Sequence, residues 1–153
     1  MTDFARLMSD YFVKYLAGQK GSGSNTMKTY RDTFVQLLEF MDEKKHIRAD
    51  CIEVDSFSYD IINEFLEYLE KEKRVSISTR NNRLAAIRSF FKYTGYHEPK
   101  YLNISTSIRE ISKKKTEGRQ MNYLSVNAME HFLNSFDKTD HKELRCFCIV
   151  LLL

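Results

Sequence analysis

Apolar residues recur at steps of three and four in five successive stretches of this 153-residue chain, and this spacing restricts the fold more than any other feature. Such a repeat places apolar side chains on one face of an α-helix, where they pack against neighbouring helices. Only 1 Pro and 5 Gly interrupt the chain, whereas a protein built from strands needs many turn residues. The sequence therefore predicts an all-α fold of amphipathic helices joined by short connectors.

The apolar stretches give approximate positions for the five helices, and the residues beside them predict where each helix begins and ends. The stretches are residues 4–16, 30–41, 61–69, 84–91 and 102–111. The residues expected to cap or end the helices are Gly18, Ser24 or Asn25, Ser58, Ser76 or Ser78, and Gly95, with Pro99 near the start of the fifth. Most of the 11 Phe and 9 Tyr fall at helical spacing, so we expect these rings in the core.

A stretch without any apolar residue, residues 112–120, follows the fifth helix and is expected to be an exposed basic linker. Beyond it, Ser125 is expected to cap a short helix, and a further helix begins near Asp140 and is still apolar at Leu153. The predicted division is therefore a helical domain, a linker and the opening of a larger domain, at residues 1–112, 113–122 and 123–153.

Charge is distributed unevenly along the chain, although the net charge is only +3. Residues 14–31 and 74–93 contain basic side chains and no acid, whereas residues 39–72 hold eleven acids against four bases. This order predicts a positive face and a negative back. Because a solvated helix face usually mixes both signs, the two acid-free stretches favour a polyanion as the partner.

The cysteines and the hydropathy pattern indicate a cytoplasmic protein. Cys51, Cys146 and Cys148 are odd in number and lack ligand spacing, so we expect buried thiols in a reducing compartment. The first ten residues lack the pattern of a signal peptide. The apolar run from Cys146 to Leu153 covers eight residues, far short of the roughly 20 that span a bilayer. We therefore expect no membrane association.

No constellation of catalytic or metal-ligating residues is apparent. Gly18, Gly21 and Gly23 lack the preceding strand and the Lys-Ser/Thr ending of a phosphate-binding loop. The 4 His residues lie far apart in the sequence, with no pair four residues apart on a helix. We therefore predict no cofactor, no metal, no small-molecule substrate and no catalytic residue in this chain.

The openings of the second and fourth helices, residues 24–31 and 76–83, combine hydroxyl and amide side chains with cations. The cations are Lys28 and Arg31 in one opening, and Arg80 and Arg83 in the other. Capping explains the hydroxyls, but cations at a helix start oppose the helix dipole. Helix starts attract phosphate, Lys and Arg neutralise it, and Asn or Arg pair with base edges. The composition therefore indicates a DNA-binding surface.

Residues 24–34 and 78–93 resemble helices of the core-binding domain in the phage integrase family of tyrosine recombinases, and the second of these stretches is the most distinctive. The polar linker, residues 123–125 and residues 143–153 resemble the same family's entry into its catalytic domain. The resemblance implies a SAM-like bundle of four or five helices at residues 1–112. A linker and the first helices of a truncated catalytic domain would follow this bundle.

The resemblance also implies what the domain binds. In that family it clamps double-stranded DNA together with the catalytic domain, and four protomers form a homotetramer on paired sites. The DNA-binding residues that it implies are Thr26, Lys28, Thr29, Arg31, Ser78, Arg80, Asn82 and Arg83 on the helices, and Lys113, Lys114, Lys115 and Arg119 in the linker. The family recombines and integrates DNA through a 3′-phosphotyrosyl intermediate. Its catalytic residues correspond to positions after Leu153, so we expect this chain alone to be inactive.

Two other functions remain open from the residues themselves. The chain could be a non-enzymatic helical interaction module whose basic face binds an acidic protein, and such a module would not respond to duplex DNA. It could also be a helix-turn-helix transcription regulator, which would recognise a DNA sequence tightly on its own, whereas half of a clamp binds weakly.

Overall fold

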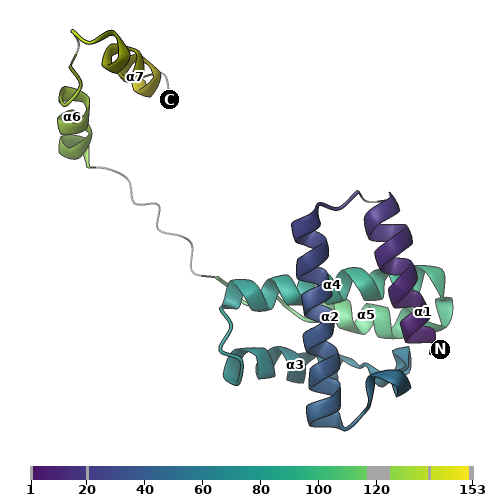
Figure 1. Cartoon of the computed structure of the whole chain (residues 1–153). Helices are drawn as coiled ribbons and strands as arrows, with labels where there is room; N and C mark the ends of the chain where they lie inside the picture. The colour runs from purple at the N-terminus through teal and green to yellow at the C-terminus, as the bar shows by residue number, and fades with distance from the viewer. Residues whose placement is uncertain (1, 20, 117–124, 138, 152–153) are drawn as a thin grey trace. The chain divides into compact units, whose positions relative to one another are not determined.

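The computed structural model describes residues 2–19, 21–116, 125–137 and 139–151, and every regular element in these ranges is a helix (Figure 1). The all-α prediction is therefore confirmed for the described residues. The chain divides into two compact units, Met1–Thr116 and Glu117–Leu153. Each unit is described by itself.

The first unit is a bundle in which α1 and α2 cross α4, and α5 runs back along α4 (Figure 1). Its α-helices are α1 (Asp3–Asp10), α2 (Ser24–Lys45), α3 (Tyr59–Lys71), α4 (Ile77–His97) and α5 (Leu102–Glu110). A π-helical segment, η1 (Tyr11–Gln19), continues α1, and the short 3₁₀ turns are η2 (Ala49–Cys51), η3 (Val54–Ser56) and η4 (Pro99–Tyr101).

The core of the bundle is centred on Phe90 of α4. Its ring centroid lies 5.5 Å from that of Phe4, 5.4 Å from Tyr11 and 5.2 Å from Phe34. The adjacent Phe91 contacts it at 5.2 Å, and all five side chains are buried. Because these rings come from α1, η1, α2 and α4, one aromatic cluster joins the elements that cross in the bundle. The prediction that the rings form the core is confirmed for this cluster.

Three of the predicted helix starts are confirmed by their caps. The side chains of Ser58, Ser76 and Ser125 each accept a hydrogen bond from the backbone N–H three residues later, at 3.2 Å. Each bond satisfies a donor that the first turn of a helix leaves without a partner. These signals are local, so the sequence carries them completely.

The prediction that Ser24 or Asn25 caps α2 is wrong. Gly23 is the cap residue, Ser24 is already helical, and no side chain caps this start. The carbonyl oxygen of Gly23 accepts from the N–H groups of Thr26 at 3.0 Å and Met27 at 3.1 Å. Glycine at this position costs only a few tenths of a kcal/mol relative to a serine cap. The polar side chains of the first turn are therefore free for other contacts.

The prediction that Gly95 ends the fourth helix is also wrong. Helix α4 continues to His97, and the chain becomes extended at Glu98, as expected for a residue that precedes proline. Gly95 instead permits close packing, because a Cβ at this position would lie 2.7 Å from the Cβ of Ser105 in α5. The first helical segment extends through Gln19, one residue past its expected end.

The second unit contains α6 (Val126–Asn134) and α7 (His141–Leu151). Helix α7 begins where the sequence predicts a helix near Asp140. The ring of Phe136 joins the two helices, with centroids 5.2 Å from Phe132 and 6.0 Å from Phe147. No described side chain of this unit is fully buried, so its apolar residues have only a small shared core.

The prediction of buried thiols is wrong for all three cysteines. Cys51, Cys146 and Cys148 are exposed and form no disulfide. Cys51 lies in the short turn η2, with its Sγ 3.7 Å from Oδ1 of Asp50, and the other two lie in the thinly packed second unit. Within the described ranges, no helix combines the length and apolar character that crossing a bilayer requires.

Candidate nucleic-acid interface

The first turns of α2 face α4 across a shallow hollow of about 280 Å³. Six residues line it, namely Asn25, Thr26, Thr29, Tyr30, Asn82 and Ala85. The fold therefore brings together three residues that the sequence selects as DNA-binding, Thr26 and Thr29 from α2 and Asn82 from α4. The sequence interpretation missed Asn25, Tyr30 and Ala85. Asn25 lies four residues from Thr29, Tyr30 four from Thr26 and Ala85 three from Asn82. Such steps place residues on one helix face, so they could have indicated these positions.

A hydrogen-bond network around Arg83 holds the two helices at this hollow. The Arg83 guanidinium donates to the carbonyl oxygen of Thr29 at 2.8 Å and to the hydroxyl of Thr33 at 3.1 Å. The Thr33 hydroxyl donates in turn to the Thr29 carbonyl at 2.7 Å, and Thr33 is buried. Arg83 is half-buried, so its charge is used between the helices rather than displayed at the surface.

The two cations of the α2 opening are accessible. Lys28 and Arg31 have exposed side chains, and neither has an ion pair among the described residues. The first turn of α2 contains no acid. Thr26, Ser78 and Asn82 are exposed as well. The two helix openings therefore display unneutralised positive charge as well as hydroxyl and amide groups, which is the chemistry that binds phosphates and base edges.

Arg80 is directed away from the free surface. It is 6% exposed, and its Nε lies 2.9 Å from Oε1 of Glu70 in α3. These two atoms are not aligned for a hydrogen bond, so the contact is an ion pair. The guanidinium also donates to Oδ1 of Asn81 at 3.3 Å and to the carbonyl oxygen of Ser112 at 3.4 Å. The structure therefore does not bring Arg80 together with Lys28 and Arg31 as an open cation.

The lysines of residues 113–115 are exposed, but they differ in their contacts. The Nζ of Lys114 lies 2.7 Å from Oε2 of Glu70, and its backbone pairs with Asn81. Arg119 lies outside the described residues. Sequence reasoning missed Glu70 and Asn81, because an acid on a solvated helix and one more amide give no local signal.

Arg88 forms a further contact between α4 and the end of the bundle. Its guanidinium donates to the carbonyl oxygen of Ile111. Desolvation, together with the nearby charges of Arg109 and Arg80, lowers the pKa of Arg88 from its ordinary value. This arginine is thus a half-buried structural donor within a basic stretch that the sequence interprets as one binding surface.

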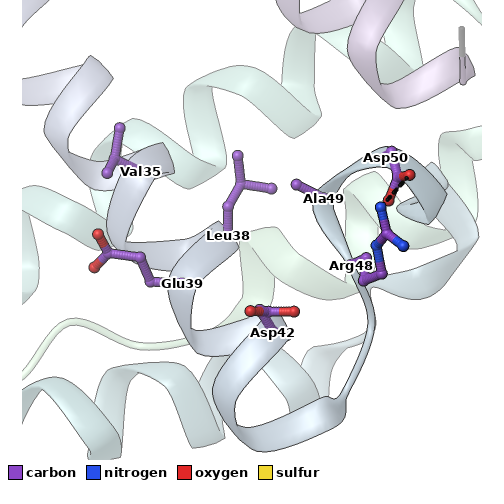
Figure 2. A pocket seen from close by; sticks show the side chains of 7 residues that line it. All are labelled: Val35, Leu38, Glu39, Asp42, Arg48, Ala49 and Asp50. Atoms are coloured by element: carbon purple, nitrogen blue, oxygen red, sulfur yellow. Dashed lines mark hydrogen bonds and ion pairs between the residues drawn. The ribbon is translucent and has the colours of Figure 1, made fainter.

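A second hollow, of about 590 Å³, lies between α2 and the turn η2 (Figure 2). Val35, Leu38 and Ala49 contribute its apolar atoms. Its charged residues are Glu39, Asp42, Arg48 and Asp50, of which Arg48 and Asp50 form an ion pair at 3.0 Å. The excess of carboxylates repels phosphate, so this hollow is not a site for a polyanion.

The part of the chain that the structure describes has no candidate metal-binding site. No group of three or more His, Cys, Asp or Glu side chains gathers there in a way that could hold an ion.

The bundle is a SAM-like helical domain, and its family follows from comparison with known proteins. Residues 10–99 match the family described as phage integrase, N-terminal SAM-like domain, which covers more than half of the chain. The chain belongs to this family. The predicted fold class and the resemblance drawn from residues 24–34 and 78–93 are thereby confirmed.

Several curated proteins are similar to the chain. A putative integrase/recombinase y4rC of Sinorhizobium fredii is 28% identical over 135 residues, covering 88% of this chain and 41% of the relative. A second one, y4rD, is 32% identical over 111 residues, covering 72% and 40%. The tyrosine recombinase XerC of Natranaerobius thermophilus is 28% identical over 124 residues, covering 81% and 39%. The chain thus spans about two fifths of the length of these relatives. No solved structure matches it significantly.

Proposed function

We propose that the first unit binds double-stranded DNA as the core-binding domain of a tyrosine recombinase. The single observation that carries the proposal is the opening of α2, where Lys28 and Arg31 are exposed without ion pairs among the described residues and the first turn contains no acid. Family membership supports it independently, since the relatives are described as integrases or recombinases.

The proposed contacts follow from the chemistry of each side chain. Lys28 and Arg31 neutralise phosphates and release counterions, which supplies most of the affinity. The helix start of α2 adds its positive dipole end and free N–H groups. Thr26 and Ser78 donate to phosphate or sugar oxygens, and Thr29 does so by giving up the bond that its hydroxyl donates to the carbonyl oxygen of Asn25 at 2.8 Å. Asn82 has the donor and acceptor that pair with a base edge in the major groove.

Arg80 and Arg83 have a different role in this proposal. Both are held by protein partners, Glu70 for Arg80 and the Thr29 carbonyl for Arg83. We therefore assign to them the positioning of α2, α3 and α4 rather than direct phosphate contacts. Lys113, Lys115 and Arg119 of the linker are proposed to contact the DNA backbone.

The activity of the longer protein is also part of the proposal. Its catalytic domain would join DNA through a 3′-phosphotyrosyl intermediate, in a homotetramer on paired sites in the cytoplasm, with residues 123–153 as the opening of that domain. This chain would then bind the DNA, and the whole recombinase would carry out DNA recombination and integration, typically for a mobile element.

A salt titration of DNA binding tests the proposal. Fluorescence anisotropy of a labelled duplex measures the affinity of the 153-residue chain and its variants over a series of salt concentrations. Lys28→Ala and Arg31→Ala should each flatten the slope of log K against log salt by about 0.9 unit if each loses one phosphate contact. The matched control is Lys44→Ala, which removes the same charge at the far end of α2, where Lys44 pairs with Glu72 at 2.8 Å.

The alternatives predict other results. If the chain were an interaction module for acidic proteins, the anisotropy of the labelled duplex would not respond to it. A helix-turn-helix regulator would discriminate strongly between duplexes as this chain alone. If Lys28→Ala and Arg31→Ala bind DNA with the slope of the parent, the proposed surface is wrong.

A further inference from the structure

The chain is held by side chains of α4 at the point where it leaves the bundle. The amide of Asn81 donates from Nδ2 to the carbonyl oxygen of Lys114 at 2.7 Å. The N–H of Lys114 donates to Oδ1 of Asn81 at 3.1 Å. A primary amide presents one donor and one acceptor side by side, so a single side chain satisfies both backbone groups of one residue. Because both backbone groups are engaged, the pairing fixes the orientation of the Lys114 backbone as well as its position.

An ion-pair cluster beneath the same residue adds a second constraint. Glu70 of α3 lies between two cations, with Oε2 at 2.7 Å from Nζ of Lys114 and Oε1 at 2.9 Å from Nε of Arg80. The side chain of Arg80 is 7% exposed and that of Glu70 is 22% exposed, so water screens their contact only partly. The ammonium of Lys114 is therefore paired with a carboxylate that it shares with Arg80.

The preceding residues are held in the same way. Arg88 donates to the carbonyl oxygen of Ile111, and Arg80 donates to that of Ser112 at 3.4 Å. The partner of Ile111 is Arg88, whereas Ser112 and Lys114 are held by Arg80 and Asn81, nearer the start of α4. The segment after α5 is therefore hydrogen-bonded to side chains of α4 from Ile111 to Lys114.

We propose that Glu70, Arg80, Asn81 and Lys114 form a linker clasp, which ties the chain to the bundle as far as Lys114. The clasp also divides the three lysines of residues 113–115 between two roles. Lys114 is the anchor, because its ammonium is paired with Glu70 and its backbone with Asn81. Lys113 and Lys115 are exposed and have no ion pair among the described residues, so they are available to DNA phosphates. This division rests on the proposed function, whereas the clasp itself does not.

Amide hydrogen exchange tests the clasp without DNA. Measured by NMR on the full chain, the Lys114 N–H should exchange at least about tenfold more slowly than in an unstructured chain. Asn81→Ala should remove this protection, and Glu70→Gln should reduce it in part, because the Asn81 pairing remains. The control is Asn82→Ala, the exposed neighbour, which should leave Lys114 protected. Unchanged exchange of the Phe90 amide in each variant shows that the bundle stays folded.

Two results would overturn the clasp. One is a Lys114 amide that exchanges at the unstructured rate in the parent chain. The other is an Asn81→Ala variant that keeps the protection of the parent while Phe90 shows a folded bundle.

The division between the lysines is tested by a salt titration with three matched variants. Lys113→Ala and Lys115→Ala should each flatten the slope of log K against log salt by about 0.9 unit, and Lys114→Ala should leave it unchanged. If Lys114→Ala flattens the slope as much as its neighbours, the division is wrong. If none of the three does so while Lys28→Ala does, the linker lysines do not contact DNA and the proposed function stands without them.

Discussion

The guanidinium of Arg83 donates to the carbonyl oxygen of Thr29 at 2.8 Å, which connects the second turn of α4 to the opening of α2. This contact sets the spacing between the two helices at the hollow lined by Thr29 and Asn82. Arg83, which the sequence suggests as a phosphate ligand, is thus a structural residue that holds α2 and α4 together beside the polar surface. The two roles can be distinguished by mutation, because replacing a structural residue lowers the free energy of unfolding, whereas replacing a phosphate ligand changes the salt dependence of DNA binding.

Arg83→Ala should lower the free energy of unfolding by about 1–3 kcal/mol, because it leaves the Thr29 carbonyl and the buried Thr33 hydroxyl with one donor fewer. Urea unfolding followed by circular dichroism measures the loss. The control is Arg31→Ala, an exposed arginine of α2, which should stay within about 0.5 kcal/mol of the parent. Equal stability of the two variants would show that Arg83 does not tie the helices.

Phe90→Ala should destabilise the bundle by about 3–5 kcal/mol, because it removes the ring on which Phe4, Tyr11 and Phe34 converge and leaves a cavity. Thermal and urea unfolding of the purified variant check this value. Tyr96→Ala removes another large ring from the same helix, but Tyr96 is 85% exposed, so its stability should match that of the parent. A mild effect at Phe90 would contradict the position given to the core.

Gly95→Ala should cost about 1–3 kcal/mol by overpacking, since the added Cβ would lie 2.7 Å from the Cβ of Ser105. Helix propensity alone predicts the opposite sign, because alanine is the better helix former. Gly18→Ala is the control, as its Cβ would meet only a backbone oxygen at 3.6 Å. In the double variant, Ser105→Gly should restore part of the lost stability, whereas no recovery would argue against a direct clash.

The sequence predicts well the parts of the fold that depend on neighbours in the chain. The caps at Ser58, Ser76 and Ser125 use a hydrogen bond that spans three residues, so the local pattern contains the whole interaction. The role of Gly95 depends on Ser105 in another helix, and a glycine suits both a helix end and a close helix contact. The spacing alone could not decide between these two roles.

The candidate site divides along the same line. Thr26 and Asn82 line the same hollow, because both follow the starts of helices that pack together. The partner of Arg80 could not be predicted, since Glu70 lies on the acidic helix α3, where solvation is the expected state of a carboxylate. The fold turns one of these acids toward α4, and this single placement changes an open cation into a buried structural one.

Asp3 gives the bundle a predicted dependence on acid. Its Oδ2 accepts from Nζ of Lys100 at 2.6 Å and from the hydroxyl of Tyr101 at 3.0 Å, so α1 is tied to η4. These two hydrogen bonds, followed by the charges of Lys100 and Arg6, hold the pKa of Asp3 below its ordinary value of 3.8. The unfolded chain takes up the proton more readily than the folded one, so the carboxylate stabilises the fold above pH 3.8. That contribution is lost as the pH falls through the lowered pKa of the folded state.

Asp3→Asn should therefore be less stable than the parent near neutral pH, and the two unfolding curves should converge below pH 3.8. Asp55→Asn, which removes an exposed carboxylate without an ion pair among the described residues, is the control for a general charge effect. A gap between Asp3→Asn and the parent that keeps its size at low pH would mean that the ionised carboxylate is not what ties α1 to η4.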